Sequence, residues 1–203
     1  QTGSDDDGRQ ARVNLSNSGI DISLVSHSSS ATGIALIEID EQANNRIVVV
    51  PGANGNCDTS WAHQVCVSIL KTVSDPTRLC CLLQLEIPLG TVAVLLETLH
   101  TAGAYTILDP APAVPLDDTL WPFIDVIIPN QGETKKLTGI YPEDDLSAGR
   151  AAGIMLAKGA RSVMIKAGAR GSWYFDEKKQ IYCPVFPVDA RDTTAAGDVC
   201  NAA

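Results

Sequence analysis

The sequence lacks the long apolar runs that characterise membrane proteins. No segment approaches the roughly 20 uninterrupted apolar residues of a membrane-spanning helix, and the first thirty residues are polar. We therefore expect neither a transmembrane helix nor a signal peptide, no membrane partner, and a cytosolic location as the default.

Positive charge is also scarce. The chain carries 15 lysines and arginines against 24 acidic residues, which gives a formal net charge of −9. Nucleic acids and anionic membranes are bound through clustered positive charge, so neither is expected as a partner. An acidic protein that handles nucleotide phosphates must hold them locally, with backbone amides and magnesium.

Three common site motifs are missing. The sequence contains no C-x-x-C pair, no histidine at the spacing of a zinc ligand, and no G-x-x-x-x-G-K-[ST] motif. Zinc-binding and P-loop proteins are therefore disfavoured. The cysteines are instead expected to be buried thiols of a reducing compartment; they are Cys57, Cys66, Cys80, Cys81, Cys183 and Cys200.

The composition that is present suits one globular α/β domain over residues 1–203, since 45% of the residues are apolar and only 19% are charged. Residues 31–40 and 45–50 are β-branched runs that predict an antiparallel pair of strands. From residue 79 onward strand and helix patterns alternate, which predicts a mostly parallel sheet covered by helices on both faces. The predicted strands are 79–85, 105–108, 124–128, 162–166, 173–175 and 181–186, and the predicted helices are 89–102, 116–122, 133–137 and 146–158.

The most informative motif is Asp192-Thr193-Thr194-Ala195-Ala196-Gly197-Asp198, near the carboxyl end. Its small residues let backbone N–H groups converge at a predicted helix N-terminus, where unpaired donors and the helix dipole favour an anionic phosphate. The Asp198 carboxylate then lies beside this anion hole and faces an acceptor hydroxyl. The alternative is an ordinary loop that precedes a helix beginning with an aspartate.

Polar or glycine-rich clusters follow the predicted parallel strands. Ligands of open parallel sheets bind in the crevice outside the carboxyl ends of the strands, so these clusters are expected to meet in one site. They are 84–86 (Gln-Leu-Glu), 109–112 (Asp-Pro-Ala-Pro), 129–133 (Pro-Asn-Gln-Gly-Glu) and 167–171 (Ala-Gly-Ala-Arg-Gly).

These motifs resemble those of the ribokinase (PfkB) family over nearly the whole chain. The segment 192–198 resembles D-T-x-[GA]-A-G-D, in which the last aspartate deprotonates the substrate hydroxyl. The resemblance implies that Asp198 is the catalytic base and binds substrate, with an anion hole of Ala195, Ala196 and Gly197. It implies a ribokinase-like fold and transfer of the γ-phosphate of ATP to the 5-hydroxyl of D-ribose. A family kinase for fructose, adenosine or a nucleoside, and a truncated non-catalytic fragment, are the alternatives.

The resemblance also implies roles for residues at the other strand ends. Glu86 matches an acidic residue that helps to hold the sugar. Asn130 and Glu133 match the family's P-N-E-x-E motif, in which Asn130 contributes to ATP binding and Glu133 acts on Mg²⁺ indirectly; Gln131 replaces the first glutamate. The motif at 109–113 is Asp-Pro-Ala-Pro-Ala, where the family has Asn-Pro-Ala-Pro-Ala.

Two further sites follow from the same resemblance. The segment 166–171 matches a nucleotide loop, K/T-x-G-x-x-G, so Lys166, Gly168 and Gly171 are expected to bind ATP, with glycine allowing close approach of the backbone. Asp192 and Thr194 match positions that line a monovalent-cation site, which implies K⁺.

The strands within 31–50, with Thr32-Gly33, resemble the family's lid, which closes over the sugar and often mediates dimerisation. An edge hairpin of the core sheet fits the bare pattern equally well. The chain begins with Gln1 and stops at Ala203, soon after Asp198. We expect a fragment that lacks both ends of the family's kinases, without their sugar-binding aspartate and G-G-K-G-A-N loop, and with little turnover by itself.

Overall fold

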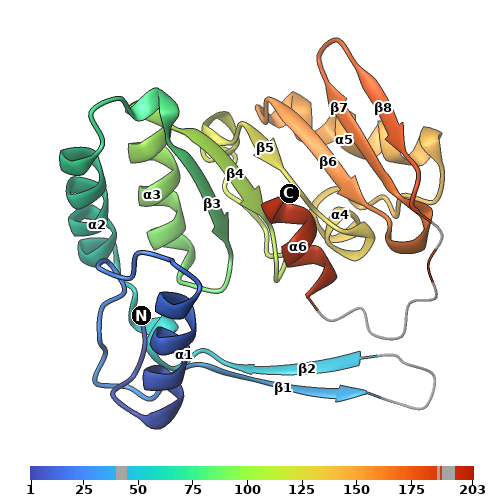
Figure 1. Ribbon diagram of the computed structural model, residues 1–203. Helices are drawn as coiled ribbons and strands as arrows, with labels where there is room; N and C mark the ends of the chain where they lie inside the picture. Colours follow the sequence, from blue (N-terminus) through green and yellow to red (C-terminus); the bar gives the residue numbers. More distant parts are fainter. Residues whose placement is uncertain (40–44, 187, 189–194) are drawn as a thin grey trace. The chain divides into compact units, whose positions relative to one another are not determined.

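The computed structural model describes residues 1–39, 45–186, 188 and 195–203 (Figure 1). The chain divides into two compact units. The first consists of residues 1–69 and 86–94, and the second of residues 70–85 and 95–203. That residues 1–203 form a single domain stays a prediction.

The first unit is built around a β-hairpin and short helices. Strands β1 (Ile34–Ile39) and β2 (Asn45–Val50) pair antiparallel, with Leu36 opposite Val48, which confirms the hairpin predicted within 31–50. Their β-branched residues favour the extended backbone. The unit also contains α1 (Asp6–Asn17), η1 (Gly52–Asn56), most of α2 (Thr59–Thr72) and the start of α3 (Leu89–Thr101).

Asp5 joins α1 to the base of this hairpin. Its carboxylate caps α1 by accepting from the backbone N–H of Gly8 at 2.8 Å. It also accepts from the backbone N–H of Thr32 at 2.7 Å and from the Thr32 hydroxyl at 2.6 Å. These hydrogen bonds, led by the one from the Thr32 hydroxyl, lower the pKa of Asp5 from 3.8 to about 2.

The stabilisation that Asp5 provides is expected to depend on pH. A carboxyl with a depressed pKa binds protons less readily in the folded than in the unfolded state, so its contribution is present above pH 3.8 and is lost as the pH falls towards 2. A Thr32→Val variant removes the hydroxyl hydrogen bond that lowers the pKa of Asp5 the most, so this pKa should rise towards 3.8. An NMR titration of the Asp5 carboxyl measures this, and an unchanged midpoint in the variant contradicts the assignment.

The second unit is a six-stranded sheet in the order β3-β4-β5-β6-β7-β8. The first four strands run parallel, and β7 and β8 complete an antiparallel hairpin against β6. The strands are β3 (Cys80–Gln84), β4 (Tyr105–Asp109), β5 (Val126–Ile127), β6 (Ser162–Lys166), β7 (Ser172–Asp176) and β8 (Gln180–Cys183). The predicted α/β class with a mostly parallel sheet and a separate small hairpin is confirmed.

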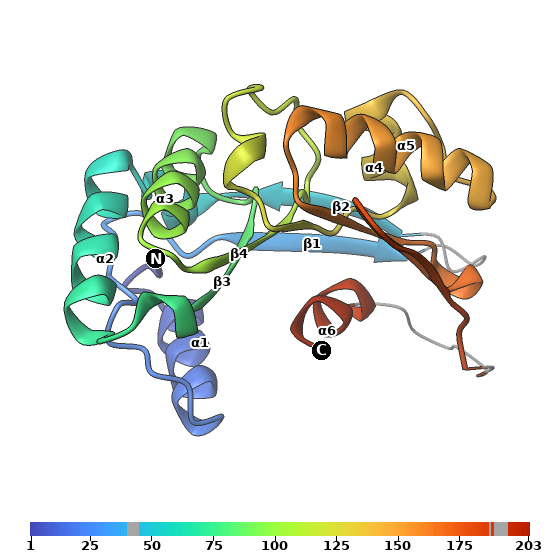
Figure 2. The same ribbon diagram turned by 90° about the horizontal axis from the view of Figure 1, so that it is seen from above.

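Helices lie on both faces of this sheet. Figure 2 shows α4 (Gln131–Thr138) and α5 (Asp145–Lys158) on one face and α6 (Ala196–Ala202) on the other. α5 packs on β6 and β7 through a strip of small residues and Met155. Opposite this strip, alternate strand residues are fully or almost fully buried, as the two-residue period of a strand requires; they are Val163, Ile165, Trp173 and Phe175.

Proline shortens two of the predicted elements. In place of a helix over 116–122 there is a single 3-10 turn, η3 (Trp121–Phe123). Pro122 lacks the backbone N–H that would donate to a carbonyl of the preceding turn in a longer helix. The last strand ends at Cys183 rather than at Phe186, because Pro184 cannot donate to a sheet. The predicted strand 124–128 is also shorter, with only Val126–Ile127 in β5.

The prediction that the cysteines are buried is wrong for two of them. Cys57 and Cys66 are buried, Cys81 and Cys200 are half-buried, and Cys80 and Cys183 are exposed. The two exposed thiols lie on β3 and β8, the outer strands of the sheet. An apolar run does not distinguish an outer strand from a central one, since both carry the same residue types.

Candidate active site

The carboxyl ends of three strands bring polar side chains to one edge of the sheet. Gln84 is the last residue of β3, Asp109 of β4 and Lys166 of β6. Gln84 and Asp109 stand opposite each other in the parallel register. Parallel strands end at the same edge, so these residues converge with Asp198 and Asn201 of α6, as the hydrogen bonds below show.

Asp109 is the buried centre of this cluster, with an exposed fraction of only 2%. Its Oδ1 lies 3.3 Å from Lys166 Nζ. Its Oδ2 accepts from Gln84 Nε2 at 3.2 Å and from Asn201 Nδ2. Lys166 Nζ also donates to Asn201 Oδ1 at 3.0 Å. The buried carboxylate of Asp109 is tolerated because these partners replace the hydrogen bonds that it would make to water.

Asp198 lies in the first turn of α6 and is exposed. Its Oδ1 accepts from Gln84 Nε2 at 3.2 Å, which connects it to the Asp109 cluster. Asn201 follows Asp198 by three residues, so the two share one face of the helix. Ala195, directly before α6, has a positive φ of 60°, a conformation that is uncommon for residues other than glycine and that clusters at functional sites.

The beginning of α6 leaves backbone N–H groups without a helical hydrogen bond. The helix starts at Ala196, and the backbone N–H of Val199 makes its first helical hydrogen bond, to Ala195 O at 3.0 Å. The N–H groups of Ala196, Gly197 and Asp198 precede that bond and are the ones a helix leaves without internal partners. The rest of the motif, including the predicted cation-site residues Asp192 and Thr194, lies outside the described residues.

Asn130 and Glu133 form a capping box at the start of α4. The Glu133 carboxylate accepts from the backbone N–H and from the side-chain amide of Asn130, both at 2.7 Å. Burial raises the pKa of Glu133, an effect opposed by the Asn130 hydrogen bond and strengthened by the nearby charge of Asp109.

This carboxylate suits an indirect contact with Mg²⁺. Mg²⁺ keeps several of its waters and takes one or two carboxylates besides substrate phosphates, and Glu133 can accept from such a water while it caps α4. Within the ranges that the structure describes, no three His, Cys, Asp or Glu side chains form a metal-binding group. A protein cage for the metal is therefore not built from those residues.

The predicted nucleotide loop follows β6 and contacts the Asn130 segment. Lys166 pairs with Asn130 in a parallel bridge, and its N–H donates to Pro129 O at 2.8 Å. Gly168 and Gly171 have φ of 55° and 88°, and a Cβ at Gly171 would lie 2.1 Å from Cys183 O. Among the described residues, no atom apart from those of Gly168 and its two chain neighbours lies within 4 Å of a Cβ placed at Gly168, so the backbone there is open to another molecule. The Lys166 ammonium itself already pairs with Asp109.

The structure therefore connects Asp198, Lys166 and the Asn130–Glu133 box in the second unit. Glu86 belongs to the first unit, with the β1–β2 hairpin, and is exposed. The sequence interpretation placed Gln84 in a strand-end cluster but gave it no role, and it missed Asn201. The signal for Asn201 was its spacing of three residues from Asp198.

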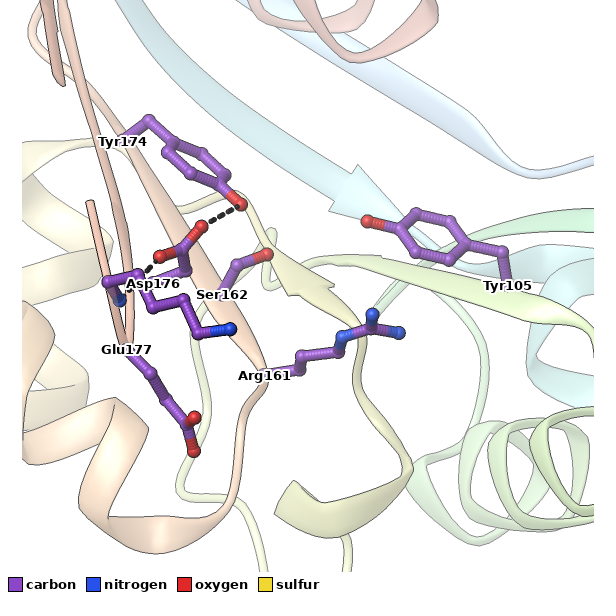
Figure 3. Close-up of a pocket in the computed structure, with 7 residues that line it drawn as sticks. Tyr105, Arg161, Ser162, Tyr174, Asp176 and Glu177 are labelled. Carbon is purple, nitrogen blue, oxygen red and sulfur yellow. Dashed lines mark hydrogen bonds between the residues drawn. The ribbon is translucent and has the colours of Figure 1, made fainter. Parts of the chain in front are cut away.

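A separate cavity of about 290 Å³ lies at the other end of the same sheet (Figure 3). Tyr105 and Ser162 are the first residues of β4 and β6, and Asp176 is the last residue of the antiparallel β7. Figure 3 also shows the Tyr174 hydroxyl directed at Asp176, 3.1 Å from its Oδ2. Since Asp109 and Lys166 end these strands, the cavity is distinct from the Asp198 cluster.

Comparison with known proteins assigns this arrangement to a family. The family of pfkB carbohydrate kinases matches residues 1–203. The ribokinase of Haemophilus influenzae is 36% identical over 200 residues, which cover 98% of this chain and 63% of that enzyme. The crystal structure of Thermotoga maritima ribokinase superposes with a TM-score of 0.78 at 29% identity, covering 98% of this chain and 63% of that one.

A third match carries ligands. The structure of Arabidopsis thaliana ribokinase complexed with ribose and ATP has a TM-score of 0.77 and 26% identity, and covers 97% of this chain and 64% of that one. The chain thus spans less than two thirds of the length of these relatives. The match to the family, in contrast, extends over all 203 residues. The chain belongs to the pfkB family of carbohydrate kinases, with the ribokinase-like fold of that family.

Proposed function

We propose that the protein to which this chain belongs transfers the γ-phosphate of ATP to the 5-hydroxyl of D-ribose. The observation that carries the proposal is the position of the Asp198 carboxylate, exposed in the first turn of α6 and linked through Gln84 to the ends of the parallel strands. The ribokinases among its relatives support ribose as the substrate.

In this proposal Asp198 accepts the proton of the sugar hydroxyl as that oxygen attacks the γ-phosphorus. The amides at the start of α6, at Ala195, Ala196 and Gly197, donate to the oxygens of the transferring phosphoryl group and stabilise the charge on them. Glu86, in the first unit, contributes to sugar binding. The bond from the γ-phosphorus to the bridging oxygen of ATP breaks, and ADP leaves.

ATP binding is assigned to Asn130, Lys166, Gly168 and Gly171. The open backbone at Gly168 supports this assignment, and the pairing of Asn130 with Lys166 places the two segments side by side. Glu133 would hold Mg²⁺ indirectly, and the ion would neutralise phosphate charge. K⁺ is assigned to Asp192 and Thr194. Among the described residues no helix is long and apolar enough to cross a membrane, and a cytosolic location is part of the proposal.

The assay for this proposal is ribose-dependent release of ADP by the protein at the length at which its own cells make it, established first by intact mass. Fructose and adenosine serve as alternative acceptors, and NMR of the product identifies the phosphorylated hydroxyl. Turnover with ribose, giving the 5-phosphate, supports the proposal. Faster turnover with another acceptor, or no turnover with any, contradicts it.

We further propose that the β1–β2 hairpin is a lid that also forms a homodimer. Exposed apolar residues occupy both of its faces: Leu36 and Val48 stand opposite each other on one, and Ile37 and Ile47 on the other. A two-stranded hairpin by itself is marginally stable in water, and exposed apolar patches mark interaction sites. One face is assigned to the bound sugar and the other to the hairpin of a second copy.

Lysine substitutions on the two faces of the β1–β2 hairpin are expected to have different effects, one on dimerisation and the other on sugar binding. Leu36 and Ile37 are 57% and 43% exposed and point to opposite faces. We expect one of Leu36→Lys and Ile37→Lys to convert a dimer into a monomer, because it buries a charge in the interface, and the other to raise the KM for the sugar. Analytical ultracentrifugation and kinetics measure the two effects. Val67→Lys, at an exposed position of α2, is the control, and a monomeric wild type contradicts the dimer.

A further inference from the structure

Gln84 makes a contact that the family motifs do not assign. Its Nε2 donates to Asp109 Oδ2 and to Asp198 Oδ1, both at 3.2 Å. A side-chain amide nitrogen carries two hydrogens, so one group can serve both carboxylates at once. The contact with Asp198 joins residues 114 apart in the sequence.

The two carboxylates that Gln84 joins lie in very different environments. Asp109 is buried and is held by Lys166 and Asn201 in addition to Gln84. Asp198 is exposed and belongs to a helix of seven residues. Fixing the rotamer of an exposed carboxylate costs conformational entropy, which a hydrogen bond can offset. Gln84 is held by the buried Asp109, so its amide can hold the Asp198 carboxylate in one orientation.

We propose that Gln84 is a positioning residue for the Asp198 carboxylate, anchored on the buried Asp109–Lys166 pair. By donating to Oδ1 it leaves Oδ2 of Asp198 to accept the proton of the acceptor hydroxyl. This inference rests on the proposed function, in which Asp198 is the base. Asn201 supports the arrangement from α6, because it bridges Asp109 and Lys166 on the helix face that carries Asp198.

The variant Gln84→Met keeps the length of the side chain and removes both donors. In the protein as its own cells make it, kcat with ribose should fall about 10- to 100-fold, the range that a small misplacement of a catalytic group produces, while the KM values for ATP and ribose stay within a factor of two or so. Gln84→Asn keeps the amide on a side chain that is shorter by one methylene, and it should lower kcat as well. This variant tests the inference if the methionine variant does not fold. Leu82→Met, two residues earlier on the same face of β3, is the matched control.

A double variant separates positioning from a general structural role. If Gln84 acts through Asp198, adding Gln84→Met to Asp198→Asn should cause little further loss of activity, since groups that act as a unit are not additive. Full kcat in both Gln84 variants, or an additive loss in the double variant, overturns the inference and leaves the kinase function standing. A wild type without sugar kinase activity overturns the proposed function and the inference together.

Discussion

Replacing Asp198 by asparagine is expected to lower kcat by a factor of about 10² to 10³ or more, because the amide cannot accept the proton of the sugar hydroxyl, and loss of a single transition-state contact already costs this much. The fold should be retained, since Asp198 is exposed and asparagine can still accept from Gln84. Nucleotide affinity should change little. Steady-state kinetics and calorimetric titration with ATP measure the two effects.

An exposed carboxylate remote from this cluster provides the control for Asp198. Glu177 follows β7 and lies at the opposite end of the same sheet, beside the cavity of Figure 3. Glu177→Gln should leave kcat within a factor of about two, as is usual for a surface substitution. Equal activity of Asp198→Asn and wild type would exclude Asp198 as the base, and loss of ATP binding together with activity would indicate misfolding.

Replacing Lys166 by methionine is expected to lower the free energy of unfolding by about 3–5 kcal/mol, the typical cost of leaving one partner of a buried ion pair without the other. Lys166 is 13% exposed in its side chain and Asp109 3%, so water cannot replace the ammonium group. Denaturant-induced unfolding measures the loss.

Two further variants test whether the charge of Asp109 causes this loss. Asp109→Asn combined with Lys166→Met should be more stable than Lys166→Met alone, because the asparagine oxygen still accepts from Gln84 or Asn201 without a buried charge. Lys158→Met is the exposed counterpart: Lys158 pairs with Asp118, which is 78% exposed, so it should cost less than about 1 kcal/mol. Similar losses at Lys166 and Lys158 would contradict the role of burial.

The sequence by itself predicted the elements whose signals lie in neighbouring residues. The β-branched runs at 31–40 and 45–50 predicted the hairpin, and the helix pattern of 146–158 predicted α5 almost to the residue. The family was recognisable from short motifs, of which 192–198 is the most specific. Hydrophobic period and motif chemistry are local properties, so they can be read without knowing the fold.

Only the tertiary structure decided how the candidate site is held together. Gln84 and Asn201 contact Asp198 and Asp109 across 114 and 92 residues of sequence, and no local pattern encodes such a pairing. The same holds for the exposure of Cys80 and Cys183, which depends on the order of strands in the sheet. A buried charge is stable only where hydrogen-bond donors surround it. For Asp109 the fold supplies these donors from Lys166, Gln84 and Asn201, which lie far from it in the sequence.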